Sequence, residues 1–322
     1  MTTDQRVISL LPSATEIVAA LGFARNLVGR SHECDFPPGI ERLPSCSSTR
    51  ISARASSDEI DRQVKELVAD GLSVYDVDVE RLRELRPSLI LTQTQCAVCA
   101  VTPRDLEHAL HTWIGAKPVL LSLEPNNLDD VMSDIRRVGE ALGASQRAAH
   151  LITSLRERLD AIREKTPENR LSVAVIEWLE PLMSAGNWMP ELVEIAGGRP
   201  LFSRAGEHSP RLDWADLAEA NPDVILLAPC GFKIAQTVGD LQLLIQNAAW
   251  LKLRAVTRGQ VYLIDGHHFF NRPGPRLVES AEMVAEILHP VRFSFGHRGI
   301  GWMPLSEGIM TQQETVTNRG GR

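Results

Sequence analysis

The chain has 322 residues, of which 43% are hydrophobic and 23% charged, and its formal net charge at pH 7 is −7. This length and composition are typical of a globular protein with room for two domains. The acidic balance argues against nucleic acid as a main partner, and no apolar stretch has the length for membrane insertion.

The first segment predicts a strand followed by a helix. Residues 7–10 are a short apolar run, which indicates a buried strand that Pro12 ends. Ser13 and Glu16 have the spacing of a capping box, and an apolar helix face follows until Gly22. We expect a β-α unit whose helix start presents polar groups at the edge of a sheet.

The same segment carries a family motif. S-L-x-P-S-x-T-E-I-x-x-x-L-G over residues 9–22 resembles the start of substrate-binding proteins for cobalamin and ferric siderophores, and the resemblance extends over residues 6–290. It implies an α/β fold of two Rossmann-like lobes joined by a single long helix. It also implies a binding protein, not an enzyme, with its ligand held between the lobes.

An internal repeat supports two similar lobes. Residues 77–91 align without gaps with residues 212–226, and each copy predicts a short helix, a proline break and a buried strand. Chance similarity between two β-α units is the alternative. Further strands are predicted at residues 118–123, 171–177 and 260–265, and a last core helix at residues 279–288.

A long helical region separates the two copies. Apolar residues recur every three or four positions from residue 128 to about 165, with an interruption at Gly143. We therefore predict a lobe over residues 1–145, a connecting helix over 146–167, a lobe over 168–290 and an extension over 291–322. Within the extension, residues 293–303 are expected to pack on the body or stay irregular, and disorder is predicted from Ser306.

The loop at residues 31–38 holds side chains that suit a metal. Histidine and cysteine bind borderline-soft metals, and histidine also ligates cobalt in corrinoids. The resemblance implies that this loop contributes to the ligand site, so we expect His32 or Cys34 to approach a bound cobalt. The alternative is a turn in which Cys34 is buried.

A Cys96-x-x-Cys99 pair lies in a second loop. Such a pair forms a redox dithiol or half of a zinc site, and it could join His32 and Cys34 in a metal site if the loops converge. The alternative is that both cysteines are small apolar residues at a helix start.

The second half of the chain supplies apolar and cationic candidates. Trp178 and Trp188 are predicted to form the flat walls that a corrin needs, with a core position as the alternative. Residues 271–276 resemble the R-P-G-P-R segment of the cobalamin-binding branch, in which Arg272 and Arg276 would hold polar or anionic groups. A salt bridge is the alternative for Arg276.

Two sets of site residues follow from these patterns. The predicted ligand-binding set is Ser13, His32, Cys34, Gln93, Gln95, Trp178, Trp188, Phe232, Asn271, Arg272 and Arg276. The predicted metal set is His32, Cys34, Cys96 and Cys99.

The sequence thus predicts a binding protein for cobalamin or a related corrinoid. The alternatives are a metal- or thiol-dependent enzyme using the metal set, and the soluble component of an ABC importer for a ferric siderophore or other metal chelate, with an ABC permease as partner. No phosphate loop or nucleophile elbow supports an enzyme. Residues 1–6 lead directly into the first strand and five cysteines occur, which predicts a cytoplasmic protein, or a periplasmic one if the N-terminus was trimmed.

Overall fold

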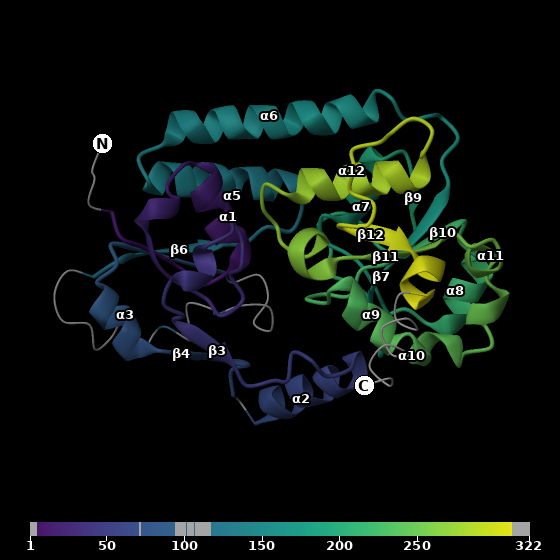
Figure 1. Ribbon diagram of the computed structural model, residues 1–322, viewed down its shortest axis with the longest axis horizontal. Helices are drawn as coiled ribbons and strands as arrows, with labels where there is room; N and C mark the ends of the chain where they lie inside the picture. Colours follow the sequence, from purple (N-terminus) through teal and green to yellow (C-terminus); the bar gives the residue numbers. More distant parts are fainter. Residues whose placement is uncertain (1–4, 71, 94–100, 102–105, 107–116, 311–322) are drawn as a thin grey trace, which may run out of the picture. The chain divides into compact units, whose positions relative to one another are not determined.

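The computed structural model describes residues 5–70, 72–93, 101, 106 and 117–310 (Figure 1). The chain divides into two compact units. The first comprises Met1–Ala53, Arg62–Arg156 and Pro273–Pro275, and the second comprises Arg54–Asp61, Glu157–Arg272 and Arg276–Arg322. The division falls inside two helices, α2 (Ser57–Ala69) and α6 (Ser145–Arg163), so that each contributes residues to both units.

A parallel sheet with the strand order β2-β1-β5-β6 organises the first unit. Its strands are β1 (Val7–Ser9), β2 (Leu27–Arg30), β5 (Leu89–Gln93) and β6 (Val119–Leu123). Strands β3 (Ser47–Thr49) and β4 (Tyr75–Val77) form a separate antiparallel pair. The central strands β1 and β5 are buried along their whole length, because their side chains are mostly apolar on both faces.

The first helix, α1 (Pro12–Ala20), begins earlier than predicted. Leu11 is the N-cap and Pro12 takes the first position, where its fixed φ angle suits a helix start. The predicted capping box is therefore wrong, since Ser13 and Glu16 both lie inside the helix and are buried. The predicted end is confirmed, because Gly22 adopts a φ of 85°, the left-handed conformation that follows many helices.

A second sheet, with the order β12-β11-β10-β7-β8 and β9 beside β7, organises the second unit. Its strands are β7 (Ser172–Trp178), β8 (Met183–Ser184), β9 (Arg199–Pro200), β10 (Val224–Leu227), β11 (Val261–Ile264) and β12 (Trp302–Pro304). Strands β7, β10 and β11 are parallel, whereas β12 runs antiparallel to β11. Ile176, Ile225 and Leu263 belong to the apolar cluster of this unit.

Each unit contains further helices. In the first unit they include α3 (Val79–Leu85) and α5 (Leu128–Ala141). In the second they include α7 (Met189–Ile195), α8 (Trp214–Ala220), α9 (Ile234–Asp240), α10 (Gln242–Ile245), α11 (Arg254–Thr257) and α12 (Leu277–Leu288). The predicted connecting helix corresponds to α6, and Gly143, with a φ of 65°, separates it from α5.

The predicted repeat is confirmed as local structure. Helix α3 leads into β5, and α8 leads into β10, with Asp78 and Asp213 at the two N-caps. Both helices end on a left-handed residue, Arg86 with a φ of 43° and Asn221 with a φ of 42°. Each copy places its strand in the interior of a sheet, which confirms the α/β fold class with two units built on mainly parallel sheets.

The described part of the C-terminal extension, residues 291–310, packs within the second unit, with Phe293 and Trp302 both buried. Strand β12 was not predicted, and residues 305–310 are helical. The prediction of disorder from Ser306 is therefore wrong for residues 306–310, and its remainder lies outside the described residues.

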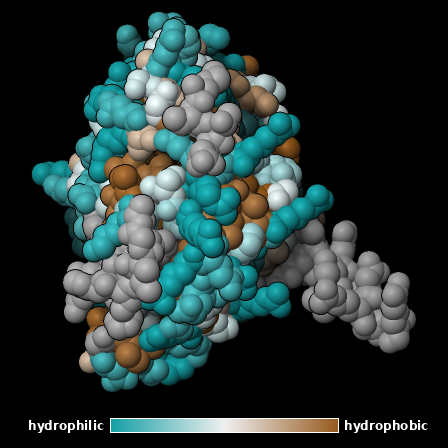
Figure 2. All heavy atoms as spheres, turned by 90° about the vertical axis from the view of Figure 1, so that its left-hand side faces the viewer, coloured by the Kyte–Doolittle hydropathy of each residue, from teal (hydrophilic) through white to brown (hydrophobic). Residues whose placement is uncertain are grey.

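Figure 2 shows a face on which hydrophilic side chains surround small hydrophobic groups. Within the described ranges, no helix has both the length and the apolarity needed to cross a membrane.

Candidate functional site

The carboxyl ends of three parallel strands form one edge of the second unit's sheet. Strand β7 ends at Trp178, β10 is followed by residues 228–232, and β11 is followed by residues 265–270. Parallel strands in α/β folds commonly present ligand-binding residues at this edge. We therefore take these three segments as the candidate site of the second unit.

Two aromatic rings meet at this edge. Trp178 and Phe232 lie 5.4 Å apart between ring centroids, at an interplanar angle of 62°. The indole nitrogen of Trp178 donates to the carbonyl of Ser57 at 3.2 Å, whereas Phe232 is buried beneath. Trp178 is half-buried, so it is the ring of this pair that retains exposed apolar surface.

Close backbone packing joins the segments after β10 and β11. A Cβ atom on Gly266 would lie 2.2 Å from the carbonyl oxygen of Pro229, so only glycine fits there. His267 N donates to the carbonyl of Phe232 at 3.0 Å. The side chain of Asn271 donates to the carbonyl of Ala228 at 3.2 Å, so in this structure the predicted ligand-binding residue Asn271 holds the loop.

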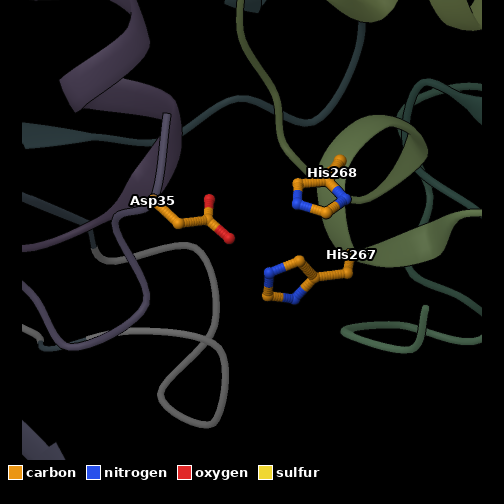
Figure 3. Close-up of side chains that lie close together, drawn as sticks. All are labelled: Asp35, His267 and His268. Carbon is orange, nitrogen blue, oxygen red and sulfur yellow. The ribbon is translucent and has the colours of Figure 1, made fainter. Parts of the chain in front are cut away.

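Two adjacent histidines project from the turn after β11 (Figure 3). Their ring centroids are 4.6 Å apart and the rings are nearly perpendicular, at 89°. Asp265 accepts hydrogen bonds from the backbone nitrogens of His267 and His268, at 3.0 and 2.8 Å. Its other oxygen lies 2.8 Å from Nδ1 of His268. Figure 3 also draws Asp35, a residue of the first unit.

Asp265, His267 and His268 were not among the site residues predicted from the sequence. The available signal was an aspartate three residues before a histidine, directly after the last predicted strand. The pKa of Asp265 lies below that of an ordinary aspartate. Burial, the largest single influence, raises it, but the hydrogen bonds from the His268 ring and amide, together with the charges of His268 and His267, lower it further.

The two predicted arginines are buried in the second unit. Arg272 Nη2 lies 3.1 Å from Nε2 of His267, and the guanidinium of Arg276 lies 5.0 Å from the centroid of the Phe269 ring. Arg272 therefore positions a histidine, and Arg276 makes a cation–π contact. Their predicted contacts with a ligand stay predictions.

Trp188 occupies a different environment from Trp178. It is 6% exposed, and its indole nitrogen donates to the carbonyl of Phe270 at 2.8 Å. This favours the core interpretation of Trp188 over its predicted role as a wall of the binding site, because its polar atom is used internally and its ring has little surface to offer.

In the first unit, His32 follows β2 and contacts the antiparallel strands β3 and β4. Its Nδ1 lies 3.0 Å from Oγ of Ser47, and its ring centroid is 5.5 Å from that of Tyr75. Burial, followed by the charge of Arg30, lowers the pKa of His32. His32 is therefore a neutral imidazole at neutral pH.

Cys34 is 1% exposed, and its sulfur accepts from Oγ1 of Thr15 at 3.0 Å. This favours the interpretation of Cys34 as a buried packing residue. Ser13 and Gln93 are also buried, and their predicted roles stay predictions. In the described part of the chain, no group of three metal-ligating side chains includes His32 or Cys34. Gln95, Cys96 and Cys99 lie outside the described residues.

Comparison with known proteins yields one family and a consistent set of relatives. Residues 7–267 match the family described as periplasmic binding protein. An uncharacterized ABC transporter substrate-binding lipoprotein of Bacillus subtilis is 25% identical over 299 residues, covering 90% of this chain and 81% of its own length. The vitamin B12-binding protein of Photorhabdus laumondii is 24% identical over 289 residues, covering 88% of each chain.

The fold recurs in solved structures. A periplasmic heme-binding protein of Pseudomonas aeruginosa superposes with a TM-score of 0.66 at 21% identity, over 89% of this chain and 94% of its own. The Bacillus relative is named as a lipoprotein and the Pseudomonas protein as periplasmic, which contradicts the predicted cytoplasmic location; that prediction is wrong. The prediction relied on the first six residues and on the number of cysteines, and neither of these features indicates the family to which the chain belongs. The relatives are also binding proteins by name, not enzymes.

Proposed function

The chain belongs to the periplasmic binding protein family, and from this premise we propose that it is the substrate-binding component of an ABC importer for cobalamin or a related corrinoid. That the protein binds a substrate follows from the family. The vitamin B12-binding relative, whose match covers 88% of both chains, supports a corrinoid as that substrate.

The site in the second unit has the chemistry that a planar metal chelate requires. Trp178, at the end of β7, offers partly exposed ring surface, and two histidines follow β11, which β10 separates from β7 in the same sheet. Large apolar ligands are held by flat apolar contacts and a few placed polar groups. The observation that carries the proposal is this combination of an aromatic face and imidazole donors at one sheet edge.

Titration of the purified chain with hydroxocobalamin, followed by tryptophan fluorescence and calorimetry, tests the proposal. We expect saturable binding with one site per chain. Trp178→Phe should remove most of the fluorescence quenching, because Trp178 is the tryptophan proposed to contact the ligand. Trp214→Phe is the matched control, since Trp214 packs on Trp250 at 6.5 Å inside the same unit.

Hemin and a ferric siderophore serve as competing ligands. Preference for hemin would replace the corrinoid with a heme, as in the name of the structurally similar Pseudomonas protein. Preference for the siderophore would support the importer role with a different cargo. Failure of all three to bind would refute a metal chelate as substrate.

A further inference from the structure

A short segment from the first half of the chain packs within the second unit. Residues Arg54–Asp61, which we call the strap, belong to this unit, whereas the residues before and after them in the chain belong to the first. The strap contains the start of α2, a helix of 13 residues of which only Ser57 and Ile60 are buried. The strap is therefore attached to the second unit with few buried side chains.

Three hydrogen bonds hold backbone groups of the strap. Ser57 N donates to Oδ2 of Asp240 at 2.9 Å, and Nε1 of Trp178 donates to the carbonyl of Ser57 at 3.2 Å. The side chain of Gln236 donates to the carbonyl of Ala55 at 3.4 Å. Asp240 is 6% exposed and accepts from the first residue of α2, where the helix dipole favours a negative charge. The bond from Asp240 is thus the strongest of the three.

Two buried hydroxyl groups oppose this attachment. Ser57 and Thr237 are both 0% exposed, and within the described part of the chain neither side-chain oxygen has a hydrogen-bond partner. Thr237 lies one turn before Asp240 on α9, so both face the same side of that helix. Water could bond to these hydroxyls if the strap moved away, which makes the attached state less stable than its packing alone would.

The strap also contacts the candidate site. Because the carbonyl of Ser57 accepts from the indole of Trp178, detachment of the strap would free the indole nitrogen and expose more of the ring. Segments with few buried apolar contacts open at a low free energy, and lids over binding sites are drawn from such segments. The strap has both properties of a lid, since it is weakly attached and lies against a proposed ligand contact.

We propose that the strap opens and closes against Trp178 in the native protein, and that its opening gates the access of a ligand to this ring. Asp240 stabilises the closed state, whereas the buried hydroxyls of Ser57 and Thr237 favour the open one. The gating of a ligand rests on the proposed function, but the opening itself does not.

Hydrogen exchange of the chain without ligand, measured by mass spectrometry, tests the opening. Amides of the strap should exchange at least about tenfold faster than those of α12, most of whose residues are buried. Asp240→Ala should accelerate exchange of the strap by about tenfold, because a hydrogen bond to a charged group is lost. Thr237→Val should slow it, because a methyl group replaces a hydroxyl that has no partner.

Matched controls separate the strap from general stability. Asp216→Ala removes an exposed acid of α8, and Thr257→Val removes a hydroxyl that donates to the carbonyl of Arg254 at 3.1 Å. Neither should change exchange of the strap. Exchange of α12 should stay as in wild type in all four variants, and circular dichroism checks that each retains the fold.

Stopped-flow quenching of tryptophan fluorescence by hydroxocobalamin tests the gate. If the strap must open before a ligand enters or leaves, Asp240→Ala should raise both the association and the dissociation rate constant, by about tenfold. Thr237→Val should lower both. A residue with a merely structural role would change the dissociation rate constant alone or weaken binding without faster association.

The outcomes are distinguishable. Equal exchange of the strap and α12, or a strap that responds to neither Asp240→Ala nor Thr237→Val, would overturn the proposal. Exchange as expected with an unchanged association rate constant would overturn the gate. Absence of quenching with hydroxocobalamin, cyanocobalamin and hemin would overturn the proposed function and the gate with it, whereas the exchange data would still decide whether the strap opens.

Discussion

The indole nitrogen of Trp302 donates to Oε2 of Glu286 at 2.7 Å, which ties strand β12 to helix α12. The other oxygen of Glu286 accepts from the backbone nitrogens of Phe295 and Gly296, the latter at 2.6 Å. Glu286 is 5% exposed, so water has little access to these donors and could not replace the carboxylate as their acceptor. One buried carboxylate thus holds the segment that follows the last predicted core helix.

Glu286→Ala should lower the free energy of unfolding by about 2 to 4 kcal/mol, because it leaves several buried donors unpaired. Urea denaturation followed by fluorescence measures this change. Glu219→Ala, at an exposed position of α8, is the control and should change stability by less than about 0.5 kcal/mol. Equal effects of the two substitutions would show that the carboxylate does not hold the extension.

A pH-sensitive pair joins the same extension to α12. Nε2 of His297 lies 2.8 Å from Glu282, which also pairs with Arg158 at 2.7 Å. The hydrogen bond to Glu282 is the largest cause that raises the pKa of His297, with burial opposing it and the charges of Glu286 and Glu279 adding to it. The protonated histidine is therefore more stable in the folded chain than in the unfolded one.

A raised histidine pKa contributes stability that is complete below the unfolded value and disappears as pH rises through the folded value. The free energy of unfolding should therefore contain a component that falls as pH rises above about 6.5. His297→Gln should lack this component. Identical pH dependence of wild type and variant in that range would contradict the prediction.

Asp134 on α5 is a buried acid in the first unit. Burial raises its pKa to about 6, although the hydrogen bond and charge of Arg137, at 2.8 Å, lower it. Arg137→Ala should raise the pKa of Asp134 further, which a carbon-detected NMR titration of the carboxyl group would measure. Arg136→Ala is the control, since Arg136 bonds to Ser133. An unchanged or lower pKa in Arg137→Ala would refute the assigned cause.

Gly266→Ala tests the packing of the candidate site. The added methyl group would meet the carbonyl of Pro229, so we expect the turn to shift and the free energy of unfolding to fall by about 1 to 3 kcal/mol. Chelate binding should weaken as well, because His267 and His268 follow directly. Gly239→Ala is the control: no atom lies near its Cβ, and alanine favours the helix there by up to about 1 kcal/mol. Stability equal to wild type in Gly266→Ala would show that the turn has room.

The sequence by itself determined the local elements and the family. Apolar runs, prolines and helix-ending glycines predicted β1, β5, β7, β10 and β11, the two long helices and the repeat, because strand and helix periodicity depend on neighbouring residues. The motif over residues 9–22 and the family match over residues 7–267 agree. Strand β12 escaped prediction because its three residues become a strand by pairing with β11, which no local pattern encodes.

Only the tertiary structure decided which candidate side chains have chemistry to offer. Trp178 ends β7 and Trp188 lies ten residues later, yet the first is half-buried and the second is 6% exposed with its indole nitrogen bonded internally. Cys34 and His268 are both metal-ligand types, yet packing buries the thiol, whereas Asp265 orients the imidazole. Burial and hydrogen-bond partners are set by distant residues, so residue type and spacing predict where a site lies and not which of its side chains can act.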